Sequence, residues 1–137
     1  MDQDTKQGIG TALSRVPAGM FVICAEHEDR RTAMLASWVQ QVCFEPPMIS
    51  VAVAKGQPIM PLISESRQFG LCQIGEDNRT LMRKFSHMDE PDEDPFLGFD
   101  LVRETVLDIP LLRKSLSYFE CSLVSHLDVE GDHDLFV

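Results

Sequence analysis

Short apolar stretches separated by polar turns dominate the pattern of the chain. Stretches rich in apolar and β-branched residues predict strands at 20–25, 32–42, 48–54, 69–74, 115–126 and 134–137, with short strands near 100–109. The segment at 48–54, MISVAVA, is the clearest of them. It is apolar on both faces, which predicts a central strand.

Three segments have the spacing of short helices. Ile9 and Leu13 lie four apart within residues 5–15, a second helical turn is expected over 59–66, and a third helix over 76–85, with Asp77 or Asn78 as its cap. Many short strands with few helices favour a mainly β fold, a β-barrel with short helices, over a doubly wound sheet. The length of 137 residues predicts a single domain over 1–137.

Composition narrows the classes of partner. The formal net charge of -10 argues against nucleic acid, since phosphate backbones are bound by clustered Lys and Arg. No apolar run approaches the roughly 20 residues of a membrane span, so no membrane is expected. The polar start, MDQDTKQ, lacks the pattern of a signal peptide and predicts a cytoplasmic location. Residues 88–95, MDEPDEDP, predict an exposed, mobile acidic loop, or alternatively a docking site for a basic partner.

The four cysteines are spaced too widely for a metal motif. They stand among apolar neighbours, which predicts reduced thiols in the core and no metal site. The last residues, Leu135-Phe136-Val137, lie within an apolar strand, and the natural chain is therefore expected to continue beyond Val137.

Five blocks of sequence resemble the flavin reductase-like family, the FMN-binding split β-barrels. They are ALSRVPAGMFVIC at 12–24, AMLASWVQQVCFEPPMISVAVAK at 33–55, FGLCQIGEDNRTLMRKF at 69–85, SYFECSLVSHLDVE at 117–130 and GDHDLFV at 131–137. The second block is the most specific, and it looks like the version found in flavin reductase domains attached to flavodiiron proteins. Cys72 stands where the family often has Asn.

The resemblance implies a Greek-key split barrel that transfers hydride from NAD(P)H to a flavin. FMN is the expected cofactor, with FAD as the alternative, and flavin and nicotinamide nucleotides are the expected ligands. It also implies a homodimer and an electron-acceptor protein as a further partner. The flavin carries out this chemistry itself, so no catalytic triad is required. Two other readings remain: a non-catalytic or electron-transferring flavin module fed by a partner protein, and a structural barrel that has lost its ligand.

By resemblance, one stretch lies along the flavin ring and ribityl chain: Met34, Leu35, Ala36, Ser37 and Trp38. The small side chains of Ala36 and Ser37 permit a close approach of the backbone, and Ser37 is a candidate donor to the ribityl or phosphate group. The alternative is that both are small residues of a tightly packed barrel. Trp38 is also a candidate for a barrel or dimer-interface residue.

The phosphate needs donors, and the resemblance implies Ala54, Lys55, Gly56 and Gln57 after the central strand. Lys55 offers a charge, and the turn offers free backbone N–H groups. Lys84 is a further basic candidate. The family's Ser or Thr beyond the central strand is missing here, because Gln57-Pro58-Ile59-Met60 has no hydroxyl. The alternative is that the Lys55 side chain does not bind phosphate and is a charged group exposed to solvent.

Three further residues complete the predicted site. Cys43 and Phe44 occupy the equivalent of a flavin-contacting turn, with an ordinary core position as the alternative for Phe44. His133 stands in the Gly-Asp-His turn, and the resemblance makes it the catalytic candidate, near the flavin and the nicotinamide. It could position the nicotinamide or supply a proton near neutral pH. A turn histidine bonded to backbone is the other reading.

Overall fold

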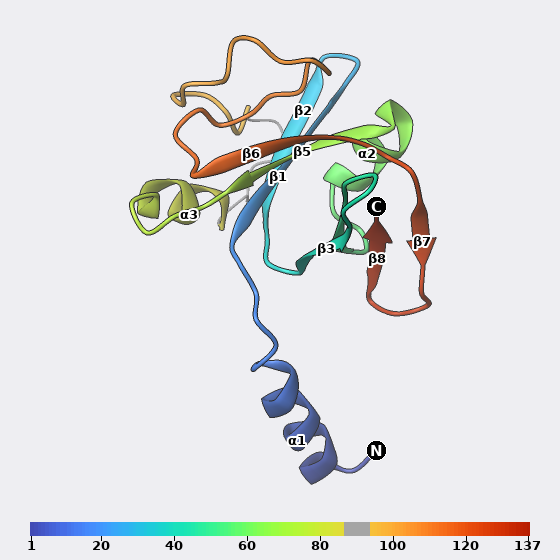
Figure 1. The fold of residues 1–137 in the computed structure, drawn as a ribbon. Helices are drawn as coiled ribbons and strands as arrows, with labels where there is room; N and C mark the ends of the chain where they lie inside the picture. Colours follow the sequence, from blue (N-terminus) through green and yellow to red (C-terminus); the bar gives the residue numbers. More distant parts are fainter. Residues whose placement is uncertain (87–93) are drawn as a thin grey trace.

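Two four-stranded antiparallel sheets form the body of the molecule (Figure 1). The computed structural model describes residues 1–86 and 94–137. The elements are α1 Gln3–Leu13, β1 Phe21–His27, β2 Arg30–Ala36, β3 Val39–Cys43, β4 Met48–Ala54, α2 Ile59–Ser66, β5 Gln68–Gln73, α3 Arg79–Phe85, β6 Ser117–Ser122, β7 His126–Asp128 and β8 His133–Phe136. The first sheet has the order β2-β1-β5-β6 and the second the order β3-β4-β8-β7. The predicted mainly β class with short helices is confirmed.

The core has two parts, one on each face of the first sheet. Ile23, Phe69 and Ile63 belong to the cluster that also takes Val51 and Phe136 from the second sheet. On the opposite face, side chains of β1 and β5 pack beneath α3 and the segment after it, in a cluster that includes Val22, Cys24, Cys72, Phe85, Phe96 and Leu111. Both faces of β1 are therefore buried, which explains its continuous apolar sequence.

Two predicted strands are each divided between the two sheets. The stretch at 32–42 forms β2 and β3, which are separated at Ser37 and Trp38, and the stretch at 115–126 contains β6 and the start of β7. In both places the chain passes from the first sheet to the second, and a single straight strand cannot do this. The expectation of one continuous strand was wrong in each case.

The short strands predicted near 100–109 are also wrong. In this part of the described chain, the only β-pairing is an isolated bridge between Leu101 and Leu112. Leu101, Val102 and Leu107 instead pack their side chains on the second core cluster without a strand partner. Apolar residues in an irregular covering segment gave the same sequence signal as a strand.

The strand β4 is central in its sheet, between β3 and β8, as predicted. Its two faces differ, however, since Val51 and Val53 are fully buried whereas Ser50 and Ala52 are only half-buried. The face that carries Ser50 and Ala52 is available to a ligand.

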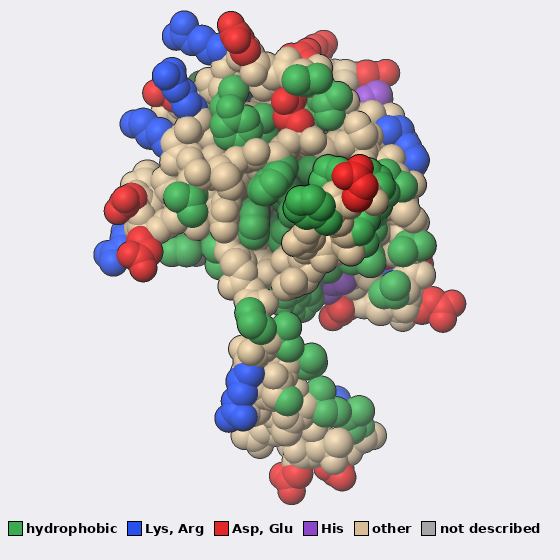
Figure 2. All heavy atoms as spheres, in the orientation of Figure 1, with side chains coloured by type: hydrophobic (Ala, Val, Ile, Leu, Met, Phe, Trp, Pro, Cys, Tyr) green, Lys and Arg blue, Asp and Glu red, His purple; other side chains and the backbone are tan. Residues whose placement is uncertain are grey.

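The helix α1 stands away from the barrel and buries none of its residues (Figures 1 and 2). Asp2 caps its start by accepting a hydrogen bond from the Thr5 N–H at 2.7 Å. Its apolar residues Ile9 and Leu13 are exposed. Within the described residues, none of the helices has the length and apolar character needed to cross a membrane. The acidic loop predicted at 88–95 lies mostly outside the described residues, because residues 87–93 are not described.

The segment that begins at Asp94 is tied to β2 by an ion pair. Arg31 Nε lies 3.1 Å from Asp94 Oδ1, and the guanidinium also contacts Asp94 Oδ2 in a bidentate arrangement. The same guanidinium lies 5.3 Å from the centre of the Phe96 ring. The hydrogen bonds from Arg31 lower the pKa of Asp94 below its ordinary value.

We expect Asp94→Asn to lower the free energy of unfolding by about 0.5–1 kcal/mol, the range of partly exposed pairs. Because the folded-state pKa of Asp94 is depressed, this contribution is present above its unfolded pKa, near 4. It is lost as the pH falls through the folded-state pKa. Urea unfolding at pH 7 and pH 3 measures it, with the exposed Asp100→Asn as control. An equal effect of Asp94→Asn at both pH values would contradict the assignment.

Candidate functional site

The pairing of β4 with β8 brings three distant segments together. Ala54 is the register partner of His133, and the Lys55 N–H donates to the Asp132 carbonyl at 2.9 Å. Trp38 joins them because its carbonyl accepts a hydrogen bond from the Ala52 N–H at 3.0 Å. The structure therefore gathers Trp38, Ala54 and His133, all of which the sequence predicts as site residues.

The side chains of Trp38 and His133 are in contact. Their ring centroids are 4.5 Å apart with an interplanar angle of 47°. His133 Nδ1 lies 2.8 Å from Asp132 Oδ1, and this hydrogen bond lowers the pKa of Asp132. The imidazole is thus fixed by its neighbour, while the indole of Trp38 is 58% exposed.

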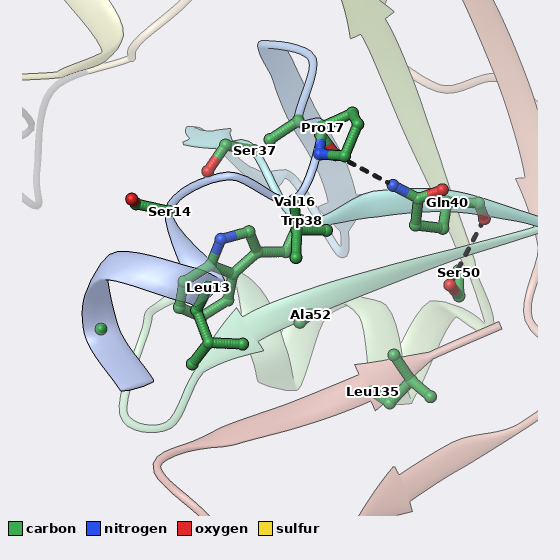
Figure 3. A pocket seen from close by; sticks show the side chains of 12 residues that line it. Leu13, Ser14, Val16, Pro17, Ser37, Trp38, Gln40, Ser50, Ala52 and Leu135 are labelled. Atoms are coloured by element: carbon green, nitrogen blue, oxygen red, sulfur yellow. Dashed lines mark hydrogen bonds between the residues drawn. The ribbon is translucent and has the colours of Figure 1, made fainter. Parts of the chain in front are cut away.

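Trp38 also borders an apolar pocket between the second sheet and the end of α1 (Figure 3). The pocket has a volume of about 670 Å³ and is lined by Gly10, Leu13, Ser14, Val16, Pro17, Ala18, Ser37, Trp38, Gln40, Ser50, Ala52 and Leu135. Its floor is the outer face of β4 and β8. Gln40 Nε2 donates to the Pro17 carbonyl at 3.3 Å, which ties the linker after α1 to the sheet (Figure 3).

The alternation of side chains along β8 separates a second polar group from this pocket. Successive side chains of a strand face opposite sides, so Asp134 points inward while His133 and Leu135 point outward. Asp134 is only 7% exposed, and its Oδ2 lies 2.8 Å from His126 Nε2. The His126 ring stacks on Phe136 with centroids 4.3 Å apart.

The Lys55 ammonium also lies near Asp134, and we call Asp134, His126 and Lys55 the inner group. Lys55 Nζ lies 2.7 Å from Asp128 Oδ1 and 3.7 Å from Asp134 Oδ1. The hydrogen bond with Asp128 raises the pKa of Lys55 and lowers that of Asp128. Within the described residues, the buried Asp134 Oδ1 has no hydrogen-bond donor. The Lys55 ammonium is therefore engaged by carboxylates on the face away from the pocket.

The turn after Lys55 has free backbone donors. Gly56 has a φ of 86°, in the left-handed region that favours glycine. No backbone acceptor for the N–H of Gly56 or Gln57 is found within the described residues. The helix α2 begins directly afterwards, and no side chain caps its N-terminus. At this start Pro58 and Pro61 have no N–H and the Met60 N–H donates to the Gln57 carbonyl at 3.1 Å, so the free donors for an anion are those of Gly56 and Gln57.

The other predicted residues are placed as follows. Met34 packs on the core between the sheets, Leu35 packs on the second core cluster, and Ala36 is buried. These three can offer only backbone groups, which is possible because β2 is an edge strand. Lys84 lies on α3. None of these four residues lines the pocket beside Trp38.

Cys43 is the last residue of β3 and Phe44 follows it, and neither residue lines this pocket. The Cys43 thiol donates to the Pro46 carbonyl at 3.0 Å and lines a different pocket, at the opening between β6 and the β3–β4 turn. Phe44 is 80% exposed, so it is not a core residue of this chain. The structure does not bring these two residues to the side chains of Ser37, Trp38 and His133.

Sequence reasoning missed most of the pocket. The sequence predicts a helix at Leu13 and a central strand at Ser50 and Ala52, but it does not indicate that these residues line one pocket with Val16 and Pro17. The signal that could have found them is the small residue at every second position of MISVAVA, which marks one face of the strand as different. His126 and Asp134 were missed because nothing in their spacing shows that they meet.

The structure thus combines two antiparallel sheets with an apolar pocket bordered by Trp38. Comparison with known families identifies the class of protein: the flavin reductase like domain matches residues 13–137. The chain belongs to the flavin reductase-like family, as the sequence blocks predicted.

Relatives of known sequence agree with this assignment. The chain is 39% identical over 123 residues to putative diflavin flavoprotein A 3 of Nostoc sp., covering 89% of this chain and 21% of the relative. It is 38% identical over 131 residues to putative diflavin flavoprotein A 2 of Synechocystis sp., covering 95% of this chain and 22% of the relative. The chain thus spans about a fifth of the length of these relatives.

Solved structures confirm the fold. An NADH:FAD oxidoreductase of Streptomyces globisporus superposes with a TM-score of 0.85 at 20% identity, covering 99% of this chain and 80% of the other. The flavin reductase component of a bacterial two-component tryptophan halogenase gives a TM-score of 0.81 at 26% identity, covering 98% and 82%. The predicted split-barrel fold is confirmed by these neighbours.

The contacts of the inner group predict that Asp134 contributes more to the free energy of unfolding than the nearby Asp132 does. Asp134→Ala leaves the His126 ring and Lys55 without the buried acceptor, and it should lower the free energy of unfolding by about 1–3 kcal/mol. Asp132→Ala removes an exposed surface partner of His133 and should leave the free energy of unfolding nearly unchanged. Urea unfolding of both variants measures the difference. Equal costs would show that the inner group does not stabilise the fold.

Proposed function

We propose that this chain holds FMN in the pocket beside Trp38 and transfers hydride to it from NADH or NADPH. The observation that carries the proposal is the contact between His133 and Trp38 at the rim of an apolar pocket built on β4 and β8. Membership of the flavin reductase-like family supports the same reaction.

The pocket suits a flat, largely apolar ring. Its volume of about 670 Å³ lies within the range of ligand sites, about 300–1,000 Å³. The small side chains of Ser37, Ser50 and Ala52 permit a close approach to the sheet, and Leu13 and Trp38 provide apolar contact. When bound, the flavin supplies the hydride-accepting chemistry. The chain supplies the shape, the exclusion of water and the donors at the edge of the ring.

We assign the phosphate of FMN to the backbone donors of Gly56 and Gln57. These donors follow Ala54, which is the register partner of His133, so they lie along the strand from the pocket. The Lys55 side chain is held by Asp128 and Asp134 on the other face of the sheet. Lys55 therefore serves the phosphate only if it leaves Asp128, and we regard it as a secondary ligand.

His133 is the residue we assign to the nicotinamide side of the site. Its Nδ1 is bonded to Asp132, which fixes the ring and leaves Nε2 for the ligand. An imidazole at this position can orient the carboxamide or supply a proton near neutral pH. The alternative function, an electron-transferring flavin module without nicotinamide chemistry, needs no such residue.

We further propose that the chain acts as a homodimer. Leu13 of α1 and Trp38 are exposed and line the pocket, and Ile9 of the same helix is a further exposed apolar residue. Isolated helices of 11 residues are marginal in water, so a second copy packed on α1 would stabilise both the helix and the pocket. A C2 interface of this kind uses the same surface on both copies.

Two further observations bear on the electron acceptor and on the cellular compartment. They are the length of the relatives and the state of the four cysteines. The relatives are named diflavin flavoproteins, and the matched region is about a fifth of their length, so we propose a second flavin site as the electron acceptor. All four thiols are free, which supports a reducing compartment such as the cytoplasm.

The direct test of the proposed function is an anaerobic absorbance spectrum of the FMN-loaded chain before and after addition of NADH or NADPH. Loss of the visible flavin absorbance at a rate above that of free FMN is expected. Bound FMN that stays oxidised with both dinucleotides would favour the electron-transfer module instead. A chain that binds no flavin would contradict both readings.

Ser37 gives the sharpest test of the binding mode. Its side chain borders the pocket, so Ser37→Leu should abolish FMN retention by filling the space, with little change in the melting temperature. Ser37→Ala removes one donor and should weaken FMN binding by about 1 kcal/mol. If Ser37 were only a small core residue, Ser37→Leu would instead lower the melting temperature by overpacking. Flavin titrations and thermal melts of both variants distinguish the two readings.

The dimer is tested by light scattering at micromolar concentration, where twice the chain mass is expected. Leu13→Asp places a charge on the apolar side of α1 and should shift the mass towards the monomer. The matched variant Thr11→Asp changes the same helix at a polar position and should leave the mass unchanged. A monomeric wild-type chain would contradict the dimer.

A further inference from the structure

Within the described residues, hydrogen bonds fix the backbone of Trp38 but not its indole ring. The Trp38 carbonyl is fixed by the Ala52 N–H at 3.0 Å, and the next residue, Val39, pairs with Val51 in the sheet. The ring itself is more than half exposed. Within the described residues, no hydrogen bond from the indole N–H to the protein is found. The side chain can therefore change rotamer without disturbing the strand.

His133, by contrast, is the fixed half of the contact. Its backbone belongs to β8 and pairs with Ala54, and its imidazole is bonded to Asp132 at 2.8 Å. When the indole moves, the imidazole stays in place. The face of His133 that the indole covers would then be open to another flat ring of similar size.

We propose that Trp38 is an aromatic lid on His133, which packs at a tilt against the imidazole in the ligand-free chain and is displaced by the nicotinamide ring of the dinucleotide. The inference rests on the proposed function, because it takes a dihydronicotinamide as the incoming ligand. It assigns Trp38 a role in controlling access of the electron donor, separate from its place in the lining of the flavin pocket.

The proposal has a definite kinetic consequence. The dinucleotide must break the indole–imidazole contact before it binds, so this contact weakens its apparent affinity. Removal of the ring in Trp38→Ala should lower KM for NADH roughly two- to tenfold, the range that corresponds to one aromatic contact. Trp38→Phe keeps a smaller ring and should lie between Trp38→Ala and the wild type. All variants are measured at saturating FMN.

A matched control separates this effect from general changes at the surface. Tyr118 of β6 is another exposed aromatic residue, but it does not line the pocket. Tyr118→Ala should leave KM for NADH unchanged. A KM that rises in Trp38→Ala would show that the indole is a stacking platform for the dinucleotide, and an unchanged KM would show that it does not cover the site. Either result overturns the lid.

A spectroscopic test observes the displacement itself. Trp38 is the only tryptophan, so a fluorotryptophan-labelled chain gives a single ring resonance by fluorine NMR. With FMN present, NAD+ should shift this resonance, whereas ADP-ribose, which lacks the nicotinamide ring, should not. In His133→Gln, which lacks the imidazole, the fluorine resonance of Trp38 should differ from that of the wild type even without a dinucleotide.

The two tests distinguish failure of the lid proposal from failure of the proposed function. A chain that oxidises NADH but whose Trp38 resonance responds equally to NAD+ and ADP-ribose contradicts the lid alone. A chain that binds FMN but neither dinucleotide contradicts the proposed reaction and the lid together. In that case His133→Gln still reports whether the indole packs against the imidazole in the free chain.

Discussion

The antiparallel pairing of β4 with β8 is the constraint on which the site depends. These strands are far apart in the sequence, and their register sets Val51 against Phe136 and Ala54 against His133. The same pairing fixes the distance between the Gly-Asp-His turn and the junction at Ser37 and Trp38, because the Trp38 carbonyl is bonded to β4. A slip of one residue would turn His133 inward and Asp134 outward.

Because neighbouring residues of a strand face opposite sides, this register places the apolar and the charged side chains on different faces of the sheet. The outer face carries Trp38, Ala52, His133 and Leu135, and it offers an apolar floor with one imidazole at its rim. The inner face carries Asp134, with Lys55 and His126 in contact with it. Charges are thus kept away from the surface where a flat apolar ring would lie, and the charged groups neutralise one another at the end of the barrel.

The sequence predicts the elements better than it predicts their assembly. The clear strand at 48–54 and the split-barrel class follow from apolar runs, and the family blocks identify the fold. Neither periodicity nor propensity shows that the chain changes sheets at Ser37, since the apolar pattern continues through the junction. The direction of the Lys55 side chain depends on partners in β7 and β8, which lie more than 70 residues away. The pocket wall from α1 was hidden for the same reason, because tertiary contacts decide which apolar residues stay exposed.

The position of the flavin beside Trp38 is the central claim, and the emission of the single tryptophan tests it most directly. FMN is titrated into the chain while its binding is followed independently by the absorbance of the flavin. The account predicts that Trp38 emission falls in proportion to the bound fraction, because a flavin ring in contact with the indole quenches it. Ser37→Leu should lose both signals together. FMN that binds with full affinity while the emission of Trp38 stays unchanged would contradict the account.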